Sequence, residues 1–213
     1  MAIRLSGKAE QNKKAKKDAL LNAAFELFTR QGINKTSISD ISSRAKVAKG
    51  TFYLYFSDKY DLRNFLIAHK AGQIFRTAKE HMLKARALPG GAAASVEDRI
   101  VFLASDIIDQ FSADPSLMRF ISKNLSWGIF KHELAVSSDP EAVDFRAVFE
   151  DAFEQSEVSY ADPEVMIFMI IELISSTSYS AILYQEPMDI HELKPYLLRA
   201  VRDIVRGHQQ DGI

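Results

Sequence analysis

The sequence lacks cysteine entirely and carries a single tryptophan among its 213 residues. Without thiols the chain can form no disulfide and offers no thiolate to a metal or a substrate. It also lacks a long hydrophobic run, since the longest, Val165–Ile171, is far shorter than the ~20 residues that cross a bilayer. The N-terminus is polar and basic, without an apolar signal segment. We therefore expect a cytoplasmic protein with no membrane partner.

Motifs for catalysis are missing as well. No glycine-rich phosphate loop is present, and His132–Glu133 and His191–Glu192 each lack the second histidine of a zinc-protease motif. The five histidines show no metal-ligand spacing. The sequence therefore predicts no catalytic residue, no metal and no cofactor. A helical small-molecule-binding protein or enzyme without a role on DNA is the alternative that stays open.

The net charge of −1 conceals an asymmetry along the chain. Residues 1–70 hold 14 Lys and Arg against 6 Asp and Glu, a balance of +8, and the remainder holds 13 against 22, a balance of −9. A basic N-terminal part can bind a polyanion, whereas an acidic part is repelled by one. This pattern predicts two regions with different tasks.

The stretch from Thr36 to Lys59 has the pattern of two short helices joined by a tight turn at residues 44–47. Ser37 and Asp40 have the spacing of a capping box at the start of the first helix. Such a pair is the outline of a helix-turn-helix, whose second helix lies in the DNA major groove. The apolar positions expected to face inward are Ile38, Ile41, Ala45, Val47, Phe52 and Phe56.

The outward side of this pair carries the chemistry that DNA requires. Lysine supplies charge for phosphates, hydroxyl groups donate to phosphates or base edges, and glycine lets the backbone approach a strand. An ordinary helical hairpin with a solvated basic face would have the same composition. The predicted phosphate contacts are Thr36, Lys49, Tyr53 and Lys59; the predicted contacts to base edges or adjacent backbone are Arg44, Thr51 and Tyr55; Ser37, Lys46 and Gly50 complete the DNA-binding set.

The order of residues from Thr36 to Leu62 resembles the DNA-binding domain of the TetR family of bacterial transcriptional regulators. Its densest part is the run Lys49-Gly50-Thr51-Phe52-Tyr53-x-Tyr55-Phe56, and Phe28-x-x-x-Gly32 upstream is similar too. Three positions depart from the family pattern: Ser42 replaces an alanine, Lys46 a turn glycine, and Ala48 a capping serine.

The resemblance implies a homodimer that occupies a near-palindromic operator as a repressor and is released by a small-molecule effector. A helix-turn-helix protein that works through protein partners, without an effector, is a third interpretation. We place the DNA-binding domain at residues 1–57 and a helical effector-binding and dimerisation domain at 58–213.

The segment before the motif is expected to be a disordered arm over residues 1–12, followed by a helix that runs to about Gln31 and ends at Gly32. A lysine cluster at the start of this helix could grip the DNA backbone. Its members are Lys13, Lys14, Lys16 and Lys17.

The remainder is helical by pattern. A long helix is expected from Asp58 to about Ala87, and a further apolar stripe begins at Val96. Three later helices should start with Asp-Pro, at 114–115, 139–140 and 162–163, because Asp accepts from free amides and Pro fits the first turn. No alternating strand pattern occurs, so the predicted fold class is all-α.

Two C-terminal helices, at about 163–184 and 189–207, resemble the pair that forms a dimer interface in the TetR family. The first has hardly any polar face, so one side can meet the protein's own core and the other a partner subunit. The predicted interface consists of Ile171, Ile174, Ser178, Leu193, Leu197, Val201 and Ile204.

The middle helices are rich in aromatic residues and methionine, which suits both an ordinary core and a ligand pocket. Glu172 stands out as a carboxylate within an apolar run, and Trp127 and Tyr179 carry polar tips. The predicted effector contacts are Phe102, Phe111, Met118, Trp127, Phe130, Phe168, Glu172 and Tyr179.

Overall fold

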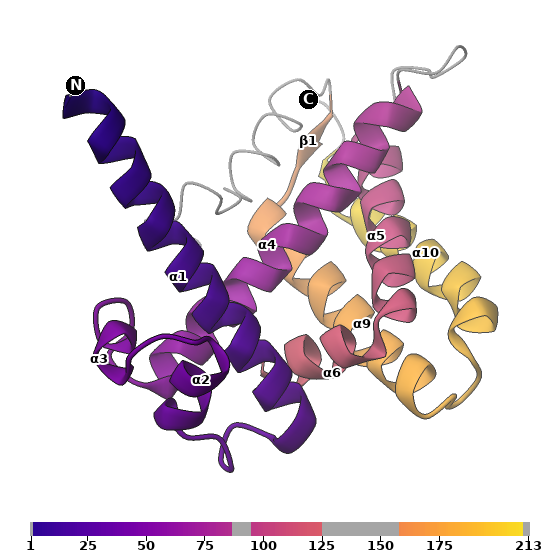
Figure 1. Ribbon diagram of the computed structural model, residues 1–213. Coiled ribbons are helices and arrows are strands. Elements are labelled where there is room, and N and C mark those ends of the chain that lie inside the picture. Colours follow the sequence, from indigo (N-terminus) through magenta and orange to yellow (C-terminus); the bar gives the residue numbers. More distant parts are fainter. Residues whose placement is uncertain (1, 87–94, 125–157, 211–213) are drawn as a thin grey trace. The chain divides into compact units, whose positions relative to one another are not determined.

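The computed structural model describes residues 2–86, 95–124 and 158–210 (Figure 1). These residues form helices and one pair of very short strands, which confirms the all-α prediction. The chain divides into two compact units, Met1–Ile67 and Ala68–Ile213. The division falls inside helix α4 (Lys59–Arg86), whereas the sequence suggested a domain boundary before that helix.

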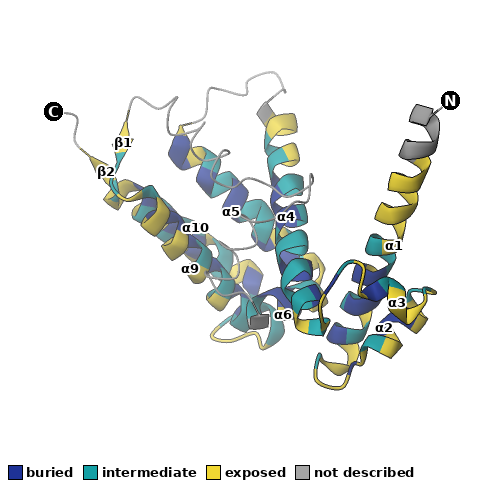
Figure 2. Ribbon diagram, turned by 90° about the vertical axis from the view of Figure 1, so that its left-hand side faces the viewer, coloured by how far each residue is buried: buried dark blue, intermediate teal, exposed yellow. Residues whose placement is uncertain are grey.

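Helix α1 (Ala2–Gln31) opens the first unit and is longer than expected. The sequence suggested a disordered arm over residues 1–12, but residues 2–12 are helical. Lysine, alanine, glutamate and glutamine dominate residues 8–17, and all four are good helix formers. The side chains of residues 8–16 are exposed (Figure 2), so this half of the helix adds charge without adding core. Gly32, at a φ of 82°, ends the helix as predicted.

Helices α2 (Ile38–Arg44) and α3 (Lys49–Phe52) form the helix-turn-helix. The predicted capping box is confirmed: the Asp40 N–H donates to the Ser37 hydroxyl at 3.1 Å, and the Ser37 N–H donates to the Asp40 carboxylate at 2.8 Å. Lys46 lies in the turn at a φ of 56°, in the left-handed region that favours glycine. Ala48 begins α3 without a side-chain cap.

The core of the first unit contains Ile41, Phe52 and Phe56, which were expected to face inward, together with Leu20 and Phe28 of α1. Val47, also expected to face inward, is only partly buried, as is Leu27. The first turns of α4 complete this core with Leu62 and Leu66, which are both fully buried. The ring of Phe56 lies 5.8 Å from that of Phe52 and 5.7 Å from that of Phe65, measured between centroids.

The second unit contains α5 (Val96–Ala113), α6 (Pro115–Asn124), α9 (Pro163–Leu183) and α10 (Ile190–Gly207). Helix α10 packs along α5 and α9 (Figure 1), and the apolar faces of these three helices form the core. Strands β1 (Ser159–Tyr160) and β2 (Gln209–Gln210) pair antiparallel. The sequence did not indicate them, because two residues are too few to show alternation.

The Asp-Pro helix starts behave differently from one another. Asp114 accepts from the N–H groups of Ser116 and Leu117, both at 3.0 Å, as predicted. Helix α9 does start at Pro163 as predicted, but Asp162 makes no side-chain cap bond, so the predicted cap was wrong there; its backbone is left-handed, with a φ of 42°. The pair at 139–140 lies outside the described residues.

The predicted dimer interface on α9 and α10 differs from what the structure shows. Four of the seven predicted residues are buried in the second unit's own core, namely Ile174, Ser178, Leu197 and Val201. Ile171, Leu193 and Ile204 keep part of their side chains at the surface. The sequence could not tell the two faces of α9 apart, because apolar residues surround the helix. By length and composition this helix could also cross a membrane, but a core helix of a soluble protein meets the same criterion.

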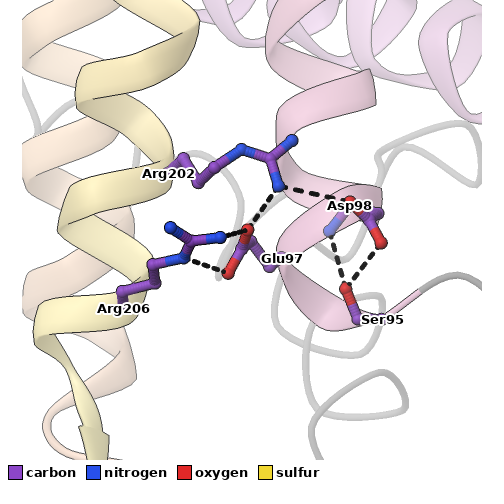
Figure 3. Close-up of polar contacts among 5 residues, drawn as sticks. All are labelled: Ser95, Glu97, Asp98, Arg202 and Arg206. Carbon is purple, nitrogen blue, oxygen red and sulfur yellow. Dashed lines mark hydrogen bonds and ion pairs between the residues drawn. The ribbon is translucent and has the colours of Figure 1, made fainter.

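A polar cluster ties the start of α5 to the end of α10 (Figure 3). Glu97 is only 9% exposed. Its carboxylate accepts from Arg206 Nε at 2.9 Å and Nη2 at 3.0 Å, and also from Arg202. Arg202 also reaches Asp98 at 3.5 Å, and Ser95 caps the helix by accepting from the Asp98 N–H at 3.1 Å. Two guanidinium groups thus compensate a carboxylate that is largely withdrawn from water.

Candidate nucleic-acid interface

The surface around α3 has the exposed basic and hydroxyl groups that the sequence predicted. Lys46, Lys49 and Gly50 are exposed, and Tyr53 is 53% exposed. Thr51 is partly exposed. The aromatic ring of Tyr53 packs edge-on against the buried Phe52, which leaves its hydroxyl at the surface. These side chains can meet phosphates without any rearrangement of the core.

Gly50 has no role that the first unit itself explains. Its φ is not in the left-handed region, and a Cβ built there would meet no atom within 4 Å apart from its chain neighbours and the backbone of its own helix. Glycine within a helix is unfavourable by about 1 kcal/mol relative to alanine. The missing side chain therefore leaves open space above α3, which suits close approach of another molecule.

Thr36 does not match its predicted role as a phosphate contact. Its side chain is only 1% exposed. The hydroxyl donates to the Gly32 carbonyl at 2.9 Å and accepts from Gln31 Nε2 at 3.3 Å. This side chain is part of the interior, and the prediction failed because sequence spacing does not reveal which way a residue before a helix cap points.

Lys59 is also engaged within the protein rather than extended into solvent. Its ammonium group donates to the backbone carbonyls of Ile33 at 2.9 Å, Thr36 at 3.0 Å and Asn34 at 3.4 Å. Sequence reasoning missed these contacts, because their partners lie more than 20 positions upstream.

Arg44, predicted to contact bases or nearby backbone, is held by Glu26 of α1. The pair is bidentate, with Nε at 2.7 Å and Nη2 at 2.5 Å from the two carboxylate oxygens. Hydrogen bonding from Arg44 lowers the pKa of the Glu26 carboxyl below its ordinary value. Both side chains are more than half exposed, so the pair is weak in free energy but orients the guanidinium.

The basic half of α1 lies against this surface. Tyr55 donates from its hydroxyl to the Lys13 carbonyl at 3.1 Å, and the Lys17 ammonium lies 3.7 Å from the centre of the Phe65 ring. Lys13, Lys14 and Lys16 are exposed. The predicted lysine cluster is therefore a rigid helical edge and not the end of a loose arm.

Leu54 was missed by sequence reasoning. It is 76% exposed directly after α3, and its N–H donates to the Thr51 carbonyl at 3.3 Å, which continues the helical turn. Gly50 and Leu54 are four positions apart and share one face of that turn. An exposed leucine gives no signal in the sequence, because leucine is ordinarily interpreted as a core residue.

The predicted effector residues differ in where they lie. Phe111 and Met118 are buried in the second unit, and Phe102 is partly buried. Phe168 and Glu172 are exposed on α9, which corrects their assignment to an internal pocket. Tyr179 packs edge-on against Tyr184, with 5.8 Å between ring centroids, and a hydrogen bond with Tyr184 raises its pKa. Trp127 and Phe130 lie outside the described residues.

No group of three or more His, Cys, Asp or Glu side chains with metal-binding geometry occurs among residues 2–86, 95–124 and 158–210. The polar cluster at Glu97 is an acid–arginine network, and its geometry is explained by helix packing. The features that point to a partner are therefore those around α3.

Comparison with known sequences points to the same part of the chain. Residues 20–64 match the family described as bacterial regulatory proteins, tetR family. The helix-turn-helix transcriptional regulator YvdT of Bacillus subtilis is 44% identical over 63 residues, which are 28% of this chain and 32% of that protein. The fatty acid metabolism regulator protein of Bacillus subtilis is 29% identical over 96 residues, 45% of this chain and 50% of that protein. The matches thus span between a third and a half of these relatives.

Solved structures share the fold over most of the chain. A TetR-family transcriptional regulator from Vibrio parahaemolyticus aligns with a TM-score of 0.61 and 21% identity, over 92% of this chain and 100% of that one. The regulator FadR from Bacillus subtilis, solved in complex with stearoyl-CoA, aligns with a TM-score of 0.57 and 20% identity, over 89% and 97%. The family model thus matches the segment that contains the helix-turn-helix, and the solved structures share the all-α fold of the chain.

Proposed function

We propose that the protein is a sequence-specific DNA-binding transcriptional regulator of the bacterial cytoplasm. Residues 1–57 would carry the DNA-contacting surface, and residues 58–213 would bind an effector and a second subunit. The observation that carries the proposal is the exposed surface of α3, where Lys49, Tyr53 and the open Gly50 coincide with the matched segment. The excess of eight positive charges over residues 1–70 supports it.

The roles on DNA follow from exposure. Lys46, Lys49 and Tyr53 would contact phosphates, and Ser37 would present the N-terminus of α2 beside them. Thr51 and Leu54 would face base edges, a leucine being suited to the methyl group of thymine. Arg44 would act from its position against Glu26, and Tyr55 would keep α1 close to the same groove.

The direct test is selection of bound duplexes from a random pool, followed by binding measurements at several salt concentrations. A specific site should emerge, and its affinity should fall steeply with salt, because phosphate contacts release counterions. Lys49→Gln should reduce the salt slope by about one without altering thermal stability. Failure of the intact, folded protein to bind any duplex at low salt would exclude this function and favour an enzyme or a ligand-binding bundle.

The outward face of α9 would join two copies of the chain. Val165, Phe168 and Met169 are 49%, 37% and 42% exposed, and Glu172 and Ser176 continue the same stripe at helical spacing. A self-complementary apolar stripe suits a two-fold dimer, which presents two recognition helices to a near-palindromic operator. Met169→Arg should convert a dimer into a folded monomer in sedimentation experiments. A monomeric unsubstituted protein would overturn the dimer.

The effector would be a small molecule bound in the second unit among apolar side chains such as Phe102, Phe111 and Met118, with Tyr179 as a polar contact. Because the Bacillus subtilis structure contains stearoyl-CoA, a long-chain acyl-CoA is the first probe to use. Repression would be relieved if the effector binds better to a state that does not fit the operator. A probe that raises the melting temperature and lowers DNA affinity supports this role; a metabolite library without any such compound favours regulation through a protein partner.

A further inference from the structure

The loop between α1 and α2, residues 32–36, has a donor for every backbone carbonyl. The carbonyls of Gly32 and Lys35 accept from local side chains, the Thr36 hydroxyl at 2.9 Å and Gln31 Nε2 at 3.2 Å. The Ile33 carbonyl accepts from the Thr36 N–H at 3.2 Å. A loop normally leaves such groups to water, so this one is held by the protein itself.

Lys59 supplies the only long-range donor to this loop among the hydrogen bonds of the described residues. Its Nζ lies 2.9, 3.4 and 3.0 Å from the carbonyl oxygens of Ile33, Asn34 and Thr36. An ammonium group has three hydrogens, and three carbonyls receive them. The side chain is partly buried, so these contacts are shielded from water more than a surface ion pair is.

The position of Lys59 joins three elements. It is the first residue of α4, whose N-terminus is capped by Asp58, with the Asp58 carboxylate 2.8 Å from the Asp61 N–H. The Thr36 carbonyl that it holds belongs to the residue directly before Ser37, the N-cap of α2. Helix α2 in turn packs on α3. A displacement of the first turn of α4 would therefore pull on the start of α2.

We infer that Lys59 is a positioning residue and not a phosphate contact: it fixes α2 and α3 by holding the α1–α2 loop to the start of α4. This inference rests on the proposed DNA-binding function. A lysine used this way must remain bound to the carbonyls when DNA is bound, because all of its hydrogens are already donated. Its charge then contributes nothing to counterion release.

The test compares Lys59→Arg and Lys59→Gln with the exposed control Lys49→Gln. A guanidinium keeps the charge and binds phosphate well, but it cannot place three hydrogens of one nitrogen on three carbonyls. If Lys59 positions the loop, both variants should bind DNA about tenfold more weakly at every salt concentration, the loss of one charged hydrogen bond. The salt slope should stay at the wild-type value, whereas Lys49→Gln should lower it by about one.

Hydrogen exchange of the Thr36 amide gives a readout that needs no DNA. That N–H is bonded to Ile33 within the loop, so its exchange should become faster in both Lys59 variants and stay unchanged in Lys49→Gln. Wild-type affinity in Lys59→Arg, with a reduced salt slope in Lys59→Gln and unchanged exchange, would make Lys59 a phosphate contact and overturn the inference. Unchanged affinity and exchange in both variants would overturn it too. If Lys59→Gln does not fold, the DNA affinity of Lys59→Arg and the exchange rate of its Thr36 amide decide between the two roles of Lys59.

Failure of the proposed DNA-binding function can be told apart from failure of the inference about Lys59. If the wild-type protein binds no duplex, there is no DNA-reading surface to position, and the exchange experiment alone reports whether Lys59 holds the loop.

Discussion

The two compact units hold their helices by different means. In the first unit the short helices α2 and α3 are fixed by polar contacts to single backbone groups, as at Ser37, Thr36 and Lys59. In the second unit the long helices α5, α9 and α10 are fixed by a continuous apolar core and one largely buried carboxylate, Glu97. Both units have an apolar core, but in the first unit single polar contacts add to that core at the ends of the short helices.

The largest expected effect tests which face of α9 is core. Ile170 is 5% exposed and its neighbour Met169 is 42% exposed. Ile170→Ala should lower the free energy of unfolding by about 2–4 kcal/mol, because it leaves a cavity. Met169→Ala should change it by less than about 0.5 kcal/mol once the protein is dilute enough to be monomeric. Urea denaturation at several protein concentrations measures both.

Equal losses in these two variants, independent of concentration, would mean that α9 is buried on all sides. The core of the second unit would then extend around the whole of α9, and no face of this helix would be free for a second subunit.

The next effect concerns two ion pairs that both join α5 to α10. Glu97→Gln leaves Arg202 and Arg206 without their shared carboxylate, and we expect a loss of about 1–3 kcal/mol, reduced from the fully buried case because the arginines are partly exposed. The matched control is Asp109→Asn, which removes the partner of Lys194 at 2.6 Å. Asp109 is 63% exposed, so its loss should stay below about 1 kcal/mol. Thermal unfolding of both variants, side by side, tests the order.

A smaller effect comes from one buried hydroxyl in each unit. Ser42 and Ser178 are 2% and 0% exposed, and neither hydroxyl oxygen has a hydrogen-bond partner. Replacement of either by alanine should stabilise the protein by about 1 kcal/mol, because an unsatisfied buried polar group is removed and alanine favours helix. Ser43→Ala, at an exposed position of α2, is the control for helix propensity alone. Destabilisation by Ser42→Ala would show that its hydroxyl does have a partner.

The smallest effect is the acid response of the α2 cap. Hydrogen bonds from the Ser37 side chain and backbone lower the pKa of Asp40 below its ordinary value of 3.8. A carboxyl with a lowered folded pKa stabilises the protein above its unfolded value, and this contribution is lost as the pH falls through the folded value. The melting temperature of wild type should therefore fall below about pH 3.8 more steeply than that of Asp40→Asn. Parallel curves for the two proteins would show that the Asp40 carboxyl does not contribute to the loss of stability in acid.

In the first unit, features that depend on neighbouring residues could be predicted from the sequence, whereas features that depend on distant residues could not. The capping box at Ser37 and the end of α1 at Gly32 were predictable, because each depends on residues within four positions of one another. The direction of the Thr36 side chain and the carbonyl contacts of Lys59 were not, because both depend on how distant segments fold together.

In the second unit the helix positions were predictable and their faces were not. Helix α9 carries apolar residues on every side, so periodicity gave no polar stripe from which its buried face could be assigned. Ser178 was read as an interface residue and lies in the core, whereas Val165 and Met169 lie outside. The partners of Glu97 were out of reach as well, since Arg202 is 105 positions away.

The loop held by Lys59 has a practical consequence for anyone who isolates the first unit. A fragment cut at Ser57, where the sequence suggests a border, would lose the cation that holds three loop carbonyls and the two leucines, Leu62 and Leu66, that close the hydrophobic interior. Such a piece would keep the whole of α3 yet lack the contacts that fix the start of α2. The shortest autonomous head should extend to Ile67.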